Sequence, residues 1–161
     1  MENFQILREK ARQTIQRADH MLTMTYPLLN EPKILVSVAG SLSNSVEMAM
    51  TALLEYERLF KRIPSYSDNF DAKFLIFREK LVPRYGINRD YIKMLLDLKE
   101  IIAAHNKSPM EFSRSNKYII CSDTYEIRTL TKDDLKRLIT KAKVFIEEMH
   151  RLTTQNDGIF K

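Results

Sequence analysis

Residues 34 to 54 read ILVSVAGSLSNSVEMAMTALL, and this stretch decides the fold. Its apolar side chains point in most directions around a helix, and a helix that is apolar nearly all round usually lies at the centre of a protein. Proline suits the first turn of a helix, which places the start of this one near Pro32. We therefore expect one long central helix from about Pro32 to Lys61. One ridge of small side chains would let a neighbouring helix approach it closely: Ser37, Ser41, Ser45, Ala49 and Ala52.

Three other segments carry the apolar stripe of an amphipathic helix. The first covers residues 3 to 26, and Pro27 helps to end it. The next runs from Asn88, a plausible N-cap, to about residue 107. The last begins at Thr131, whose side chain would cap the helix ahead of two first-turn acids. These segments would pack around the central helix.

Two shorter features complete the pattern. A short helix precedes Pro83 and should stop there, because the residue before a proline disfavours the helical conformation. Residues 108 to 130 then break the helical rhythm. Within them Tyr118 to Cys121 is a β-prone run, and residues 125 to 128 could return as a second strand. The short helix would present one apolar side made of Phe70, Phe74, Phe77 and Leu81.

The composition fits one domain. The chain has 161 residues, of which 44% are hydrophobic and 29% charged, and only three are glycines. A chain of this length can bury a core without a disulfide or a metal. We expect a mainly all-α fold: a four-helix up-and-down-type bundle with a short extra helix and a small β-hairpin insertion before the last helix. Residues 1 to 161 would form a single domain, with 155 to 161 as a frayed tail.

Several function classes lack their signatures. There is no Gly-rich phosphate loop, no His-Glu-x-x-His motif and no Gly-x-Ser-x-Gly motif. Cys121 is the only cysteine, so a disulfide within the chain and a cysteine-rich zinc site are excluded. We expect no metal and no cofactor. The polar start of the chain and the lack of a long apolar run predict a soluble cytoplasmic protein with no membrane contact.

His105 is the most informative of the three histidines, because it continues the apolar stripe of the helix from 88 to 107 to its end. One interpretation is a boundary histidine that packs its ring and hydrogen-bonds a nearby carbonyl group. The other is an acid/base group that works near neutral pH. Glu47 lies among apolar residues on the central helix and predicts a hydrogen bond or ion pair between helices. Glu57 and Lys61, four residues apart, predict an ordinary surface ion pair.

A mild net charge of +5 permits an acidic partner such as RNA. Side chains that could stack on bases or contact phosphates lie in several segments of the chain. The alternative interpretation is that these are solvated loops with half-buried tyrosines. The candidates for binding are Arg84, Arg89, Tyr91 and Arg114.

The order of these elements resembles the HEPN superfamily of small helical bundles, found in prokaryotic toxin and RNA-defence systems. The resemblance covers most of residues 3 to 154. It lies in Leu7 to Arg12 of the first helix, in Ala49 to Leu54 of the second, and in a penultimate helix that ends with Leu98 to His105 before a β-like insertion. It implies a helical bundle that forms a homodimer.

Active members of that family are metal-independent ribonucleases, with an arginine, four to six residues, and a histidine near the end of the penultimate helix. His105 matches the histidine, and Lys99 stands in the arginine place with five residues between. Lysine lacks the planar fork of arginine that holds a phosphate. Six helical positions of about 100° also place the two side chains roughly 120° apart on a straight helix. Many family members without the motif act as binding or partner domains.

We therefore expect a non-catalytic helical interaction module, with a homodimer formed through the largely apolar second helix and a protein partner still to be identified. The first alternative is a metal-independent endoribonuclease in which His105 is the acid/base and Lys99 steadies the phosphate. The second is an RNA- or ribosome-associated binding protein.

Overall fold

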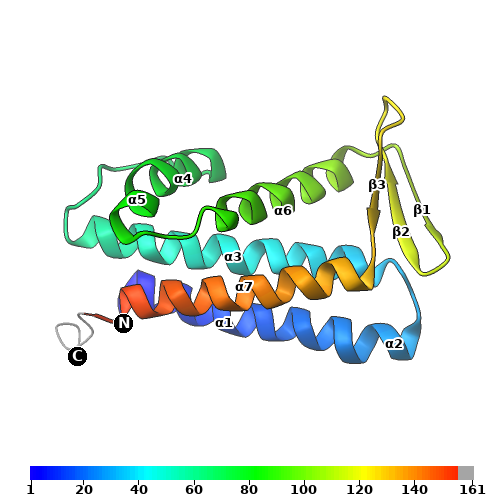
Figure 1. The fold of residues 1–161 in the computed structure, drawn as a ribbon, viewed down its shortest axis with the longest axis horizontal. Helices are drawn as coiled ribbons and strands as arrows, with labels where there is room; N and C mark the ends of the chain where they lie inside the picture. Colours follow the sequence, from blue (N-terminus) through cyan, green and yellow to red (C-terminus); the bar gives the residue numbers. More distant parts are fainter. Residues whose placement is uncertain (156–161) are drawn as a thin grey trace.

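The computed structural model describes residues 1 to 155 and shows a mainly helical fold with one small sheet (Figure 1). Its elements in chain order are α1 (Asn3–His20), the π-helical segment η1 (Met21–Thr25), α2 (Tyr26–Leu29), α3 (Ile34–Leu59), α4 (Phe70–Ile76), the π-helical segment η2 (Phe77–Leu81), α5 (Val82–Tyr85), α6 (Asp90–Lys107), β1 (Met110–Arg114), β2 (Lys117–Cys121), β3 (Ile127–Leu130) and α7 (Lys132–Thr153).

The four long helices α1, α3, α6 and α7 run alternately up and down, with α3 packed against each of the other three (Figure 1). Sixteen of the 26 residues of α3 are buried, which explains why its sequence is apolar nearly all round. The predicted fold class and the central position of this helix are confirmed. The apolar second helix is used inside the core, however, so its buried residues are not free to form an interface.

Two helices continue past prolines where the sequence predicts an end. The first helix passes Pro27 and ends at Leu29, and the short helix passes Pro83 and ends at Tyr85. A proline inside an α-helix lacks a donor and clashes with the carbonyl four residues earlier. In both cases a five-residue π-helical segment directly precedes the short α-helical segment that contains the proline. The wider π-helical turn moves the carbonyl group four residues earlier away from the proline ring, so the two do not clash.

The insertion before α7 is a three-stranded antiparallel sheet in the order β1-β2-β3. The predicted two-stranded hairpin therefore lacks one of the sheet's strands. A strand that returns alongside residues 118 to 121 is predicted, but it spans Ile127–Leu130 rather than the expected 125 to 128, and β1 is not predicted. Ser115 and Asn116 join β1 to β2 with φ angles of 49° and 62°. A two-residue turn with both residues in the left-handed region suits the twist of a hairpin, and asparagine tolerates that region well.

The cap predicted for α7 is present, whereas the N-cap residue of α6 is Arg89 rather than the predicted Asn88, and the Arg89 side chain forms no cap hydrogen bond. The Thr131 hydroxyl accepts a hydrogen bond from the backbone N–H of Asp134 at 3.1 Å, and Asn88 Oδ1 accepts one from the N–H of Asp90 at 2.9 Å. No helix among residues 1 to 155 is both long enough and apolar enough to span a bilayer. Of the tail predicted to fray, all but Gln155 lies outside the described residues.

Candidate functional site

A chain of three polar side chains connects the end of α6 to the sheet. His105 Nδ1 lies 2.7 Å from Glu111 Oε1, and the Tyr118 hydroxyl donates a hydrogen bond to Glu111 Oε2. An ionised carboxylate only accepts hydrogen bonds, so the His105 proton in this contact lies on Nδ1. The Glu111 side chain is 15% exposed and that of His105 35%. The carboxylate therefore orients the ring while Nε2 stays available for other contacts.

Local structure explains why these groups meet. The Ser108 hydroxyl, just past the end of α6, lies 2.7 and 2.6 Å from the carbonyl oxygens of Met110 and Cys121, which share its one proton. This contact holds the start of β1 and the end of β2 against the helix end. In the strand register Glu111 pairs with Ile120, and its side chain faces α6 together with Tyr118. Burial and the hydrogen bond to Glu111 raise the pKa of Tyr118 to about 12.

Lys99 belongs to a different contact. Its Nζ lies 3.1 Å from Glu47 Oε2 on α3 and 4.7 Å from the centre of the Phe70 ring. The predicted ion pair of Glu47 with another helix is thus confirmed, and its partner is Lys99. Lys99 and Glu47 are 39% and 24% exposed, and pairs this accessible to water contribute little stability. Lys99 and His105 therefore contact separate carboxylates on separate elements.

Glu57 forms a polar cluster that the sequence did not reveal. The prediction of a surface pair with Lys61 is wrong, because the Glu57 side chain is fully buried. The Tyr85 hydroxyl donates to its Oε1, while Arg62 and Arg84 lie 3.3 and 3.5 Å from its two oxygens. Burial and the bond to Glu57 raise the pKa of Tyr85 to about 12. The cluster ties α5 to the end of α3, and the carboxylate has the partners that burial demands.

The four predicted binding residues have different surroundings. Arg84 contacts Glu57, and Arg89 is exposed at the start of α6. Tyr91 is buried, with its ring 5.1 Å from that of Phe145 on α7. Arg114 lies at the far end of β1, beside the hairpin turn. Within residues 1 to 155 no three His, Cys, Asp or Glu side chains gather as a metal site.

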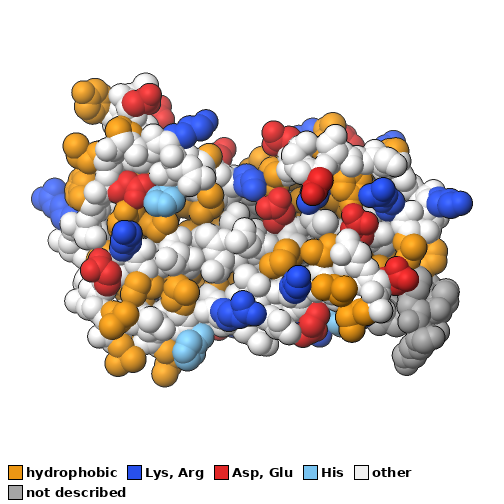
Figure 2. All heavy atoms as spheres, turned by 180° about the vertical axis from the view of Figure 1, so that it is seen from behind, with side chains coloured by type: hydrophobic (Ala, Val, Ile, Leu, Met, Phe, Trp, Pro, Cys, Tyr) orange, Lys and Arg blue, Asp and Glu red, His pale blue; other side chains and the backbone are white. Residues whose placement is uncertain are grey.

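An apolar groove lies at the C-terminal end of α1. Its lining includes the apolar Met21, Leu29 and Ile34 and the basic Arg17 and His20, and its volume is about 680 Å³. No Asp or Glu lines it. Figure 2 shows hydrophobic side chains gathered at this end of the molecule, at the lower left of the view, where Leu28 and Leu29 are 83% and 65% exposed. Such a surface suits contact with another protein.

Comparison with protein-family models, curated proteins and solved structures finds no match to this chain. The resemblance to HEPN domains therefore stays a prediction from the sequence.

Proposed function

We propose that this chain is a non-catalytic helical interaction module, similar to the HEPN domains that lack the ribonuclease motif. One observation carries the proposal: Lys99 and His105 each contact a different carboxylate, Glu47 and Glu111, which lie on α3 and β1. A phosphate would need both side chains to converge on it, and an acid/base catalyst needs a nearby charge that stabilises the transition state. The exposed apolar groove beside α2 is the kind of surface that binds a protein partner.

A cleavage assay tests the non-catalytic part of this proposal. Labelled RNA is incubated in EDTA with the wild-type protein and with His105→Ala. Lys93→Ala, in which an exposed lysine on the same helix is lost, serves as the matched control. We expect none of the three to cleave the RNA above the protein-free background. Cleavage that the wild type and Lys93→Ala share and His105→Ala loses would refute the proposal.

The ribonuclease alternative rests on one specific observation. Glu111 orients the His105 ring through Nδ1, as a carboxylate does for an acid/base histidine in many enzymes. If cleavage were found, Glu111→Gln would then lower it, and Lys99→Ala would leave it unchanged because Lys99 contacts Glu47. This result would support a ribonuclease function in place of the interaction module, with no catalytic role for Lys99.

An RNA- or ribosome-associated role is supported only by the net charge of +5. Binding through phosphates weakens steeply as salt rises, because condensed counterions are released. A titration of labelled RNA at about 50 and 200 mM salt separates the two proposals. The interaction module predicts no binding at either concentration, and salt-sensitive binding would favour the RNA-associated role.

A further inference from the structure

The outward face of the small sheet is apolar and uncovered. In the strand register, two rows of side chains point away from the bundle: Met110, Cys121 and Ile127 in one, and Phe112, Ile119 and Thr129 in the other. Met110, Phe112 and Ile127 are 60%, 40% and 66% exposed. An antiparallel sheet with one face in water normally carries polar side chains on that face. The opposite, inward face is already buried through Tyr118, Ile120 and Leu130.

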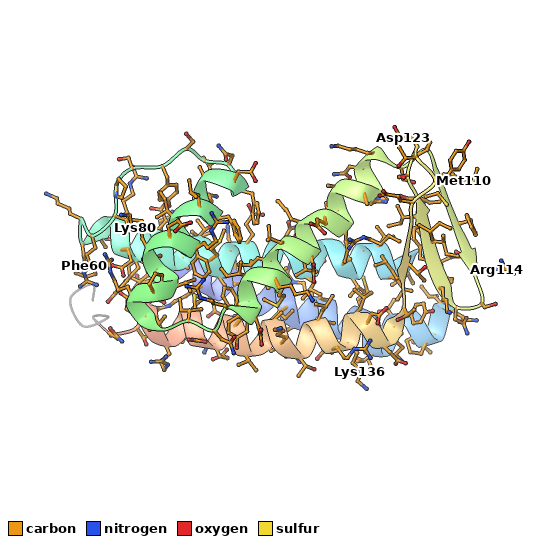
Figure 3. The ribbon with its side chains drawn as sticks, turned by 45° about the horizontal axis from the view of Figure 1, so that its top comes forward. Phe60, Lys80, Met110, Arg114, Asp123 and Lys136 are labelled. Carbon is orange, nitrogen blue, oxygen red and sulfur yellow. The ribbon has the colours of Figure 1, made fainter. Side chains whose placement is uncertain are left out.

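The charges at the two connections between the strands differ in sign. At one end Arg114 stands directly opposite Lys117 across the hairpin. Like charges in this position destabilise a strand pair, and neither residue forms an ion pair within the part of the chain that the structure describes. Beyond the other end, the loop between β2 and β3 carries Asp123 and Glu126. Figure 3 shows Asp123 and Met110 at one end of the sheet and Arg114 at the other.

We infer that this face binds the same face of a second copy of the chain. A two-fold axis that lies between the sheets and crosses the strands reverses one sheet relative to the other. The basic end of each copy then meets the acidic end of its partner, while the apolar rows pack between them. A two-fold axis parallel to the strands would instead place like charges together. The charge pattern therefore selects one of the two face-to-face arrangements.

The same charges argue against other occupants. A membrane with anionic lipids attracts Arg114 and Lys117 but repels the loop that carries Asp123 and Glu126. A partner segment of one sign would satisfy only one end of the sheet. A second copy satisfies both ends at once.

The size of the face sets the strength of the association. The three strands have five, five and four residues, and at about 3.4 Å per residue and 4.8 Å between strands the sheet has a flat footprint of roughly 230 Å². Stable interfaces bury about 800 Å² on each partner. We therefore expect a weak, transient dimer. This inference rests on the proposed role as an interaction module and names its partner.

Sedimentation between about 5 and 500 μM tests the dimer over the concentrations at which a weak complex forms. The wild type is expected to change from the 19.0 kDa monomer toward twice that mass. Phe112→Glu should stay monomeric, and the matched control Val144→Glu, which alters an apolar residue 57% exposed on α7, should behave as the wild type. Far-ultraviolet circular dichroism confirms that each variant is folded. A wild type that stays monomeric to 500 μM would overturn the inference, and so would dimerisation of folded Phe112→Glu.

A charge exchange tests the arrangement without touching the apolar rows. The variant Arg114→Glu with Lys117→Glu has two acidic ends, and the variant Asp123→Lys with Glu126→Lys has two basic ends. Each alone should lose at least tenfold in self-association, and an equimolar mixture should form a heterodimer. A mixture that fails to associate would overturn the arrangement. None of these outcomes bears on RNA cleavage, so a failure here is distinct from a failure of the non-catalytic proposal.

Discussion

Replacing Tyr85 with phenylalanine should destabilise the protein far more than the same change at Tyr66. Each hydroxyl donates a hydrogen bond to a carboxylate of α3: Tyr85 to Glu57 and Tyr66 to Glu55. The two acceptors differ in their access to water, because the Glu57 side chain is 0% exposed and that of Glu55 is 23% exposed. Water can replace the lost donor at Glu55 but not at Glu57.

The magnitude follows from this difference. A hydrogen bond to a buried charged group contributes about 1.5 to 3 kcal/mol. Arg62 and Arg84 still contact Glu57 in Tyr85→Phe, so we expect a loss of about 2 kcal/mol, near the lower end of that range. For a protein of this size that corresponds to a fall in Tm of roughly 4 to 8 °C. Tyr66→Phe should cost less than about 1 kcal/mol.

Urea unfolding followed by circular dichroism measures both free energies, and calorimetry gives the two Tm values. Both variants delete one oxygen atom and leave the ring in place. The difference between their losses of stability therefore reports how strongly the burial of the accepting carboxylate affects its hydrogen bond. Equal losses in Tyr85→Phe and Tyr66→Phe would refute the argument that the burial of Glu57 sets the strength of its bonds. A loss confined to Tyr66→Phe would refute it as well.

Two further predictions concern the core helix and the sheet. Gly40→Ala should raise the free energy of unfolding by about 0.5 to 1 kcal/mol, because alanine favours the helix and its added Cβ meets no atom within 4 Å; a lower stability in urea would contradict this. The folded-state pKa of Tyr118, about 12, lies above its ordinary value of 10.0, so the stability from its protonated hydroxyl is complete below pH 10 and is lost as the pH rises toward 12. The difference in stability between the wild type and Tyr118→Phe should therefore shrink across that range, and a constant difference would contradict this cause.

The long helices could be predicted because their evidence is local. The apolar run from residue 34 identifies α3 as the central helix, and the Thr131 side chain caps α7 as its position before two acids indicates. Strand β1 was missed because its five residues include only two hydrophobic side chains, Met110 and Phe112, and these face water. Its pairing with β2 depends on the two-residue turn at Ser115 and Asn116.

The polar contacts depend on how distant segments meet, and the sequence shows this only in part. Glu47 was expected to pair with another helix, because a carboxylate among apolar residues needs a partner. That its partner is Lys99 depends on where α6 crosses α3. Glu57 was misjudged because its spacing from Lys61 is typical of a surface pair, whereas its hydrogen-bond partner Tyr85 lies 28 residues away in the sequence. Likewise, Glu111 could not be assigned to His105 while β1 itself was unknown.

The π-helical segments make two helices sensitive to chain length. A π-helical turn accommodates one residue more than an α-helical turn, so deleting a single residue from η1 could restore regular α-helix while the flanking turns keep their orientation. The ring of Pro27 would then meet the carbonyl that the wider turn now keeps away from it. The same holds for η2 and Pro83. In both helices the proline and the extra residue are therefore coupled, and a change in either one requires an accommodating change in the other.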